Sequence, residues 1–140
     1  MPVVLNPYLN FAGNTRAAME FYRTVFGGEL TLSTFGENQM PGASAAEAEN
    51  IMHAELRAPN GILFMASDTP PGMNVSVGST ISMSLSGDDE PQLRSYFQQL
   101  SADGAVTMPL EPAPWGDTFG MCTDRFGVNW LVNILGTQAQ

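Results

Sequence analysis

Residues 5–11 alternate between apolar and polar side chains, with Leu5 on the apolar side. A period of two with one apolar face is typical of a half-buried strand. Residues 18–26 then carry apolar side chains at helical spacing, after Asn14, which we expect to cap the helix, and before a glycine pair that ends it. Further strands are predicted at residues 29–35, 51–57 and 62–67.

The same order of elements begins again after residues 68–78, whose prolines and glycines are typical of a linker. Alternation predicts a strand at residues 80–85, with Ile81 on its apolar side. A second helix follows, and we expect Asp88 or Asp89 to cap it. The last strands are predicted near residues 105–110, 118–123 and 128–135.

Two aromatic pairs mark this repetition. Phe21-Tyr22 lies in the first predicted helix and Tyr96-Phe97 lies in the second, 75 residues later. Two unrelated β-α segments could also produce one such pair. The repeated order of elements is the stronger observation, and it favours a duplicated unit.

The predicted fold class is therefore α+β, with two β-α-β-β-β modules at about residues 3–69 and 78–136. A Pro/Gly linker joins them within a single domain of residues 1–140, a length that can bury a core. Each module has one helix, which can cover only one face of its sheet. We expect the other faces to surround one open, cup-shaped cavity.

Composition narrows the function classes. Apolar residues make up 44% of the chain and the formal net charge is −9, with five Lys plus Arg residues. This charge disfavours nucleic acid and anionic membranes as partners, and the sequence predicts no membrane span. The first residues lack the features of a signal peptide, and Cys122 has no second cysteine to pair with. We therefore expect a cytoplasmic protein.

The strand phase predicts which side chains line the cup. Polar and mixed positions alternate with the apolar positions that should pack on the helices. Trp115 follows two prolines, where it could form the cavity wall or simply pack. Tyr8 is the best polar anchor, unless it is buried against the other module. The predicted ligand-binding residues are Asn6, Tyr8, Met65, Thr80, Ser82, Trp115, Leu131 and Asn133.

One strand carries the candidate catalytic groups. His53 is the single histidine. It shares one face of this predicted strand with Glu55 and Arg57, and the opposite face is apolar. His53 and Glu55 point the same way, so they could act as a general base or a weak metal site. A solvated outer face is the alternative interpretation.

Two further side chains, Cys122 and Trp130, and one long loop also have predicted positions or roles. Cys122 is expected to be a small, half-buried strand residue, since no base is placed beside it, and Trp130 is expected in the core. Residues 36–50 form a predicted loop long enough to be a lid or a disordered tip.

Several segments resemble a known family. They are "YLNFAGNTRAAMEFYRTVFGGEL", "MHAEL", "FMASDTPPG" and "WGDTFGMCTDRFGVNWLVN". Together with the duplicated β-α-β-β-β order, they are similar to the vicinal oxygen chelate superfamily of glyoxalase I, bleomycin-resistance proteins and extradiol dioxygenases. The PhnB-like group of small bacterial proteins is the most similar branch, and the resemblance covers nearly the whole chain.

This resemblance implies a fold and a usual metal site. Enzymes of the superfamily hold a divalent metal through side chains on the first, fourth, fifth and eighth strands. Those positions fall on Asn6, Met65, Thr80 and Leu131, which are poor ligands for such a metal. We therefore expect no metal at the usual site and no cofactor. Some members of the branch carry a methyltransferase label, but this sequence lacks a glycine-rich turn for an adenosyl cofactor.

Three functional hypotheses remain. The first is a protein that binds or sequesters a small organic ligand in the cup without a metal. The second is an enzyme of the lyase or isomerase type that uses His53 and Glu55 for proton transfer, with or without an atypical divalent metal. The third is an interaction module whose cup is filled by its own side chains. The resemblance also implies a homodimer.

Overall fold

The structure is a computed structural model that describes residues 5–37, 47–69 and 81–136. The chain divides into two compact units, which comprise residues 1–76 (unit 1) and 77–140 (unit 2). Each unit has its own helix and its own four-stranded sheet. The cup that the two units would share depends on their relative placement, and it stays a prediction.

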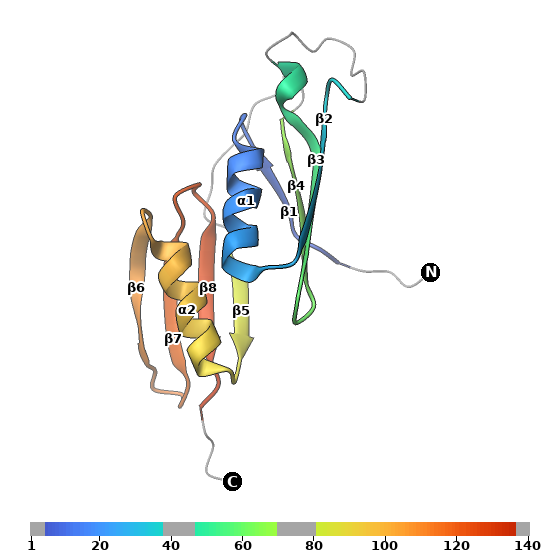
Figure 1. Cartoon of the computed structure of the whole chain (residues 1–140). Helices are drawn as coiled ribbons and strands as arrows, with labels where there is room; N and C mark the ends of the chain where they lie inside the picture. The colour runs from blue at the N-terminus through green and yellow to red at the C-terminus, as the bar shows by residue number, and fades with distance from the viewer. Residues whose placement is uncertain (1–4, 38–46, 70–80, 137–140) are drawn as a thin grey trace. The chain divides into compact units, whose positions relative to one another are not determined.

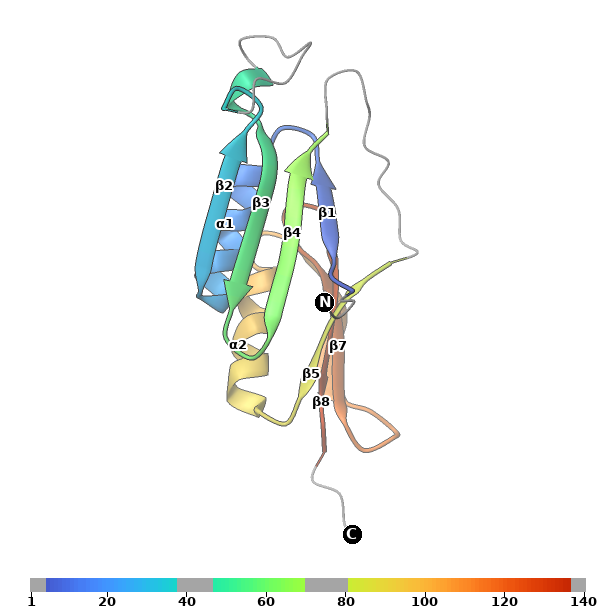
Figure 2. The same ribbon diagram turned by 90° about the vertical axis from the view of Figure 1, so that its right-hand side faces the viewer.

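Unit 1 contains one helix that packs on one face of its sheet (Figure 1). The strands lie in the order β1-β4-β3-β2, with β1 parallel to β4 and the other pairs antiparallel. Figure 2 shows the opposite face of this sheet, with α1 behind it. The elements are β1 (Tyr8–Phe11), α1 (Thr15–Phe26), β2 (Glu29–Thr34), the 3-10 helix η1 (Glu47–Glu49), β3 (Ile51–Ala58) and β4 (Ile62–Asp68).

Unit 2 repeats this topology. Its strands lie in the order β5-β8-β7-β6, and β5 is parallel to β8. The elements are β5 (Met83–Gly87), α2 (Glu90–Ser101), β6 (Ala105–Pro112), β7 (Thr118–Thr123) and β8 (Asn129–Ile134). Both units are β-α-β-β-β modules, which confirms the predicted α+β fold class. Within the described parts of the chain, neither helix has the length and apolar character that a membrane crossing requires.

The core of each unit confirms the predicted strand phase. In unit 1, the ring of Phe64 lies edge-on to Tyr22 and Phe26 of α1, with centroid distances of 5.5 and 6.3 Å. In unit 2, Trp130 and Val132 are buried on the side of α2, as predicted for the last strand. We call the face of each sheet opposite its own helix the open face.

The start of α1 corrects two expectations. The side chain of Asn14 makes no capping hydrogen bond. Asp68, predicted to begin the linker, is the last residue of β4 and is only 2% exposed. Its Oδ1 accepts hydrogen bonds from the backbone N–H of Gly13 at 2.8 Å and from the N–H and hydroxyl of Thr15 at 3.0 and 2.7 Å. Its Oδ2 accepts from the N–H of Ile51 at 2.8 Å, so one carboxylate joins α1, β3 and β4.

A second buried carboxylate organises unit 2. Asp124 is 3% exposed, and its Oδ1 accepts from the N–H groups of Phe126 and Val128 at 2.8 and 3.1 Å. Its Oδ2 accepts from the indole Nε1 of Trp130 at 2.8 Å. The turn between β7 and β8 is therefore closed by local contacts. In contrast to α1, α2 has a cap of its own, because Asp89 accepts from the N–H of Gln92.

Two boundary predictions are wrong. Leu5 is 97% exposed and β1 begins at Tyr8, and Ile81 is 80% exposed and β5 begins at Met83. Apolar and polar residues alternate at these positions, but no strand forms there because the pairing with β4 and β8 begins only at Tyr8 and Met83. Of the predicted loop, residues 38–46 lie outside the described residues, and its base is closed by the hydrogen bond from the N–H of Phe35 to the carbonyl of Asn50.

We predict that Asp68→Asn lowers the free energy of unfolding by about 2–4 kcal/mol, because the amide cannot accept all the hydrogen bonds that the buried carboxylate accepts. Urea denaturation followed by circular dichroism measures this change. The control Asp88→Asn alters an exposed carboxylate and should change stability by less than about 0.5 kcal/mol. Equal effects of the two substitutions would contradict the role of Asp68.

Candidate functional site

The open face of unit 1 carries a row of four side chains, one from each strand. Tyr8 of β1 pairs with Met65 of β4, Met65 pairs with Glu55 of β3, and Glu55 pairs with Thr31 of β2. Paired residues point to the same face of a sheet, so these four side chains lie side by side. The predicted ligand residues Tyr8 and Met65 are thereby brought together, and 46% of Tyr8 is exposed.

A second row runs beside the first. Asn10 pairs with Ser67, and Ser33 pairs with His53. The rings of Tyr8 and His53 lie 6.3 Å apart between centroids, so the two rows form one surface. His53 is half-buried and Ser67 is 8% exposed. The surface around His53 is therefore polar and aromatic, and Glu55 of the first row is a charged group close to it.

Glu55 shares the open face with His53, as predicted, but its carboxylate binds another partner. Arg57 Nε donates to Glu55 Oε2 at 2.5 Å, and the Arg57 side chain is 66% exposed. Both residues are described by the structure, and no hydrogen bond joins His53 to Glu55. Glu55 and Arg57 instead line a shallow depression of about 480 Å³ along β2, together with Arg23 and Glu29.

The open face of unit 2 is richer in apolar groups. Leu131 of β8 pairs with Ser84 of β5 and with Met121 of β7, and Met121 pairs with Met108 of β6. The predicted residue Ser82 lies just before β5 and is exposed. Thr80 lies outside the described residues.

An aromatic pair lies at one end of this face. Phe119 of β7 pairs with Asn133 of β8, and the ring of Trp115 meets Phe119 edge-on at 5.7 Å. Trp115 lies in the turn between β6 and β7 and is 59% exposed. It packs on Phe119 with one edge and leaves much of its surface accessible.

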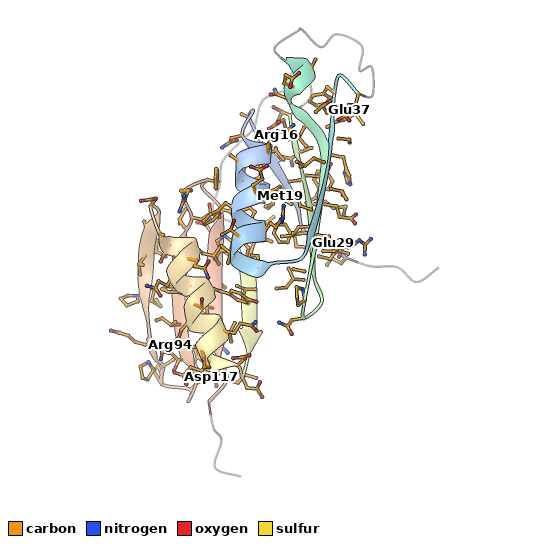
Figure 3. The ribbon with its side chains drawn as sticks, viewed as in Figure 1. Arg16, Met19, Glu29, Glu37, Arg94 and Asp117 are labelled. Atoms are coloured by element: carbon orange, nitrogen blue, oxygen red, sulfur yellow. The ribbon has the colours of Figure 1, made fainter. Side chains whose placement is uncertain are left out.

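Asp117 joins this turn to the end of β8; its position is labelled in Figure 3. Its Oδ1 accepts from the N–H of Gly136 at 2.9 Å, and its Oδ2 accepts from Nδ2 of Asn133 at 3.0 Å. These hydrogen bonds hold the pKa of the carboxyl below its usual value. The bond from Gly136 has the largest effect, and the Trp115 side chain contributes less. Asp117 therefore stays ionised and stays an acceptor.

Three described residues stand at positions that the resemblance assigns to metal ligands, and none of the three suits a hard divalent ion. Met65 offers a soft thioether, Leu131 offers no ligand atom, and Asn6, two residues before β1, offers a neutral amide. Where the structure places side chains, it contains no group of three or more His, Cys, Asp or Glu residues able to hold a metal.

Sequence reasoning missed two groups of this site. Asp117 and Phe119 were not singled out, because a carboxylate in a turn and a strand aromatic are common in any sequence. The signal that could have found Phe119 is its phase: it is two residues from Met121 on β7, and so points to the same open face. Nothing in the local sequence links Asp117 to Asn133, which is 16 residues away.

The two β-α-β-β-β modules, each with one open sheet face, have the fold of the glyoxalase/bleomycin-resistance superfamily. The crystal structure of a glyoxylase/bleomycin resistance protein/dioxygenase domain from Frankia has the same fold, with a TM-score of 0.67 and 16% identity over 100% of this chain and 96% of that one. The likeness shows the fold alone.

The chain belongs to the PhnB-like branch of that superfamily, in the family described as 3-demethylubiquinone-9 3-methyltransferase, which matches residues 4–133. Protein YjdN of Escherichia coli is 32% identical over 96% of this chain and 97% of its own length. The crystal structure of PA1353 from Pseudomonas aeruginosa is 36% identical, with a TM-score of 0.83 over 96% of this chain and 99% of that one. A Bacillus cereus PhnB protein, named a putative 3-demethylubiquinone-9 3-methyltransferase, is 26% identical, with a TM-score of 0.75 over 94% and 99%.

Cys122 lies on the helix side of β7 rather than in this site. It is 1% exposed, more buried than the predicted half-buried position. Burial, and to a smaller extent the charge of Asp124, raises the pKa of its thiol to about 11. A thiol with this pKa is a weak nucleophile at neutral pH.

We predict that Cys122 in the folded protein resists a disulfide reagent at mildly alkaline pH and reacts fully once the chain is unfolded. The unfolded thiol ionises near its ordinary pKa of 9.0 and the folded thiol near about 11. Because the unfolded state loses its proton first, stability should fall as pH rises through that interval. Thiol titration with and without denaturant measures the first effect, and rapid labelling of the native protein would contradict it.

Proposed function

We propose that this protein binds a small organic ligand on the open faces of its modules, without the divalent metal that superfamily enzymes use. The observation that carries the proposal is the register of unit 1, which gathers Tyr8, Met65, Ser67 and His53 on the face that α1 does not cover. A surface of aromatic, thioether and hydroxyl groups suits a neutral or weakly polar molecule.

The N-terminus of α1 does not fit the adenosyl cofactor that the family description implies. Nucleotide-binding folds place a glycine-rich turn before this kind of helix and leave its N–H groups free for the ligand. Here the N–H groups of Gly13 and Thr15 donate to the carboxylate of Asp68. These N–H groups are therefore not available to a cofactor, so we assign no step to it.

We further propose a cytoplasmic homodimer. The resemblance to the superfamily supports the dimer, and the single, buried Cys122 suits a reducing compartment. Light scattering coupled to size-exclusion chromatography should give a mass of about twice the 15.0 kDa of one chain. A mass of a single chain would overturn the dimer and leave the ligand proposal unaffected.

A screen of small neutral and aromatic compounds by protein-observed NMR tests the ligand proposal. We expect shifts at residues of the open faces, and we expect Tyr8→Ala to weaken a unit 1 binder by about tenfold through lost ring contact. The matched control is Thr24→Ala, which alters an exposed position on α1. Shifts confined to helix surfaces would contradict the proposal. A stoichiometric divalent ion in the purified protein, found by elemental analysis, would overturn its metal-free form.

The second candidate is an enzyme in which His53 transfers a proton. The observation that favours it is the position of His53 beside Tyr8 on a half-buried surface, because histidine is the side chain that most often transfers protons in catalysis. Glu55 is held by Arg57, so it would act as a neighbouring charge rather than as the bonded partner of His53.

For any compound that the protein converts, we predict that His53→Ala lowers kcat by at least about a hundredfold. Glu55→Gln should have a smaller effect, because its carboxylate is engaged by Arg57. Steady-state kinetics across pH measures both. Unchanged turnover in His53→Ala would remove this residue from the mechanism.

A further inference from the structure

The open face of unit 2 contains an amide whose direction is determined by a neighbouring carboxylate. Asn133 can present either its N–H₂ group or its carbonyl oxygen to a ligand. Asp117 Oδ2 lies 3.0 Å from Nδ2 of Asn133. An ionised carboxylate only accepts hydrogen bonds, so the N–H₂ group must point to Asp117. The carbonyl oxygen Oδ1 of Asn133 is then left for another donor.

Asp117 is well suited to this task. The N–H of Gly136 donates to its other oxygen at 2.9 Å, which holds the carboxylate between the end of β8 and the turn before β7. The backbone carbonyl of Asp117 also accepts from the N–H of Ala113 at 2.7 Å, and this closes the turn that carries Trp115. One residue therefore orients the amide of Asn133 and fixes the turn beside it.

Asn129 shows why the carboxylate matters. It lies on the same face of β8, and its Oδ1 accepts from the hydroxyl of Thr123 at 2.8 Å. A hydroxyl both donates and accepts, so it would satisfy either orientation of that amide. Of these two amides, only that of Asn133 has a neighbour that determines which of its atoms faces a ligand.

The surroundings of Asn133 specify the rest of the ligand. Phe119 is its cross-strand partner, and Trp115 packs edge-on against Phe119 with 59% of its surface exposed. Beyond them lie Leu131 and Met121, paired across the strands. A flat ring placed on this aromatic and thioether surface has its edge within reach of Asn133.

We propose that the open face of unit 2 binds an aromatic molecule that carries a hydrogen-bond donor, such as a phenol, and that Asp117 is the positioning residue that selects the donor. The ring packs on Trp115 and Phe119, and its hydroxyl donates to Oδ1 of Asn133. This inference rests on the proposed ligand-binding function and names the class of ligand.

The experiment compares 4-methylphenol with 4-methylanisole, which have the same ring but differ in the donor. Two-dimensional NMR of the full chain follows the indole N–H of Trp115 and the side-chain amide of Asn133 during titration with each compound. We expect 4-methylphenol to bind about threefold to tenfold more tightly, the value of one neutral hydrogen bond. Asp117→Asn should reduce this preference to less than about twofold while the ring contact at Trp115 persists.

The matched control is Asp103→Asn. Asp103 is an exposed carboxylate in unit 2 with a φ of 60°, a conformation that asparagine also adopts readily. This variant should keep the full preference. A second variant, Asn133→Leu, should bind both compounds equally, and it tests the acceptor directly if Asp117→Asn disturbs the turn.

The outcomes separate this inference from the broader proposal. Equal affinity of the wild type for the two compounds, with shifts at Trp115, would overturn the role of Asp117 and leave ligand binding on this face standing. Shifts confined to Tyr8 and His53 would overturn the assignment to unit 2 and support binding in unit 1. No shift at any residue would overturn the inference, and the compound screen would then decide the broader proposal. A preference that survives in Asp117→Asn would also contradict it.

Discussion

Among the described residues, each unit has one α-helix, which can cover only one face of its four-stranded sheet. This constraint divides the side chains of every strand into two sets. One set is buried against the helix, as the rings of Tyr22, Phe26 and Phe64 show in unit 1. The other set cannot be covered by that helix, so its composition is not dictated by the core of its own unit. Candidate functional residues therefore collect on the open faces, and the phase of a strand decides which residues they are.

The two open faces differ in chemistry although the units share a topology. Unit 1 presents Tyr8 and His53 among hydroxyl and amide groups, and unit 2 presents Trp115 and Phe119 among thioether and aliphatic groups. A duplicated module can keep its core while its open face changes, since substitutions there leave the helix contacts intact. Leu131 stands at a position that the resemblance to the superfamily assigns to a metal ligand, which fits this separation.

Much of this arrangement was predictable from the sequence, because burial of one sheet face makes apolar and polar residues alternate along each strand. The alternation in residues 128–135 correctly placed Trp130 in the core and Asn133 on the other face. What could not be predicted are contacts between residues far apart in sequence. Asp68 caps a helix that begins 53 residues earlier, and Asp117 orients an amide 16 residues later, and neither spacing forms a local motif. The same limitation explains Leu5 and Ile81, whose alternation has no paired strand beside it.

The cap of α1 has a consequence for how the chain matures during synthesis. The second helix carries Asp89 at its own start, so it can be capped as soon as it leaves the ribosome. The first helix must wait for Asp68, which emerges only after β2, β3 and nearly all of β4. A nascent chain that ends before Asp68 has a first helix whose leading N–H groups lack their carboxylate. The carboxylate that caps the first helix is thus supplied by the last residue of the first module's final strand.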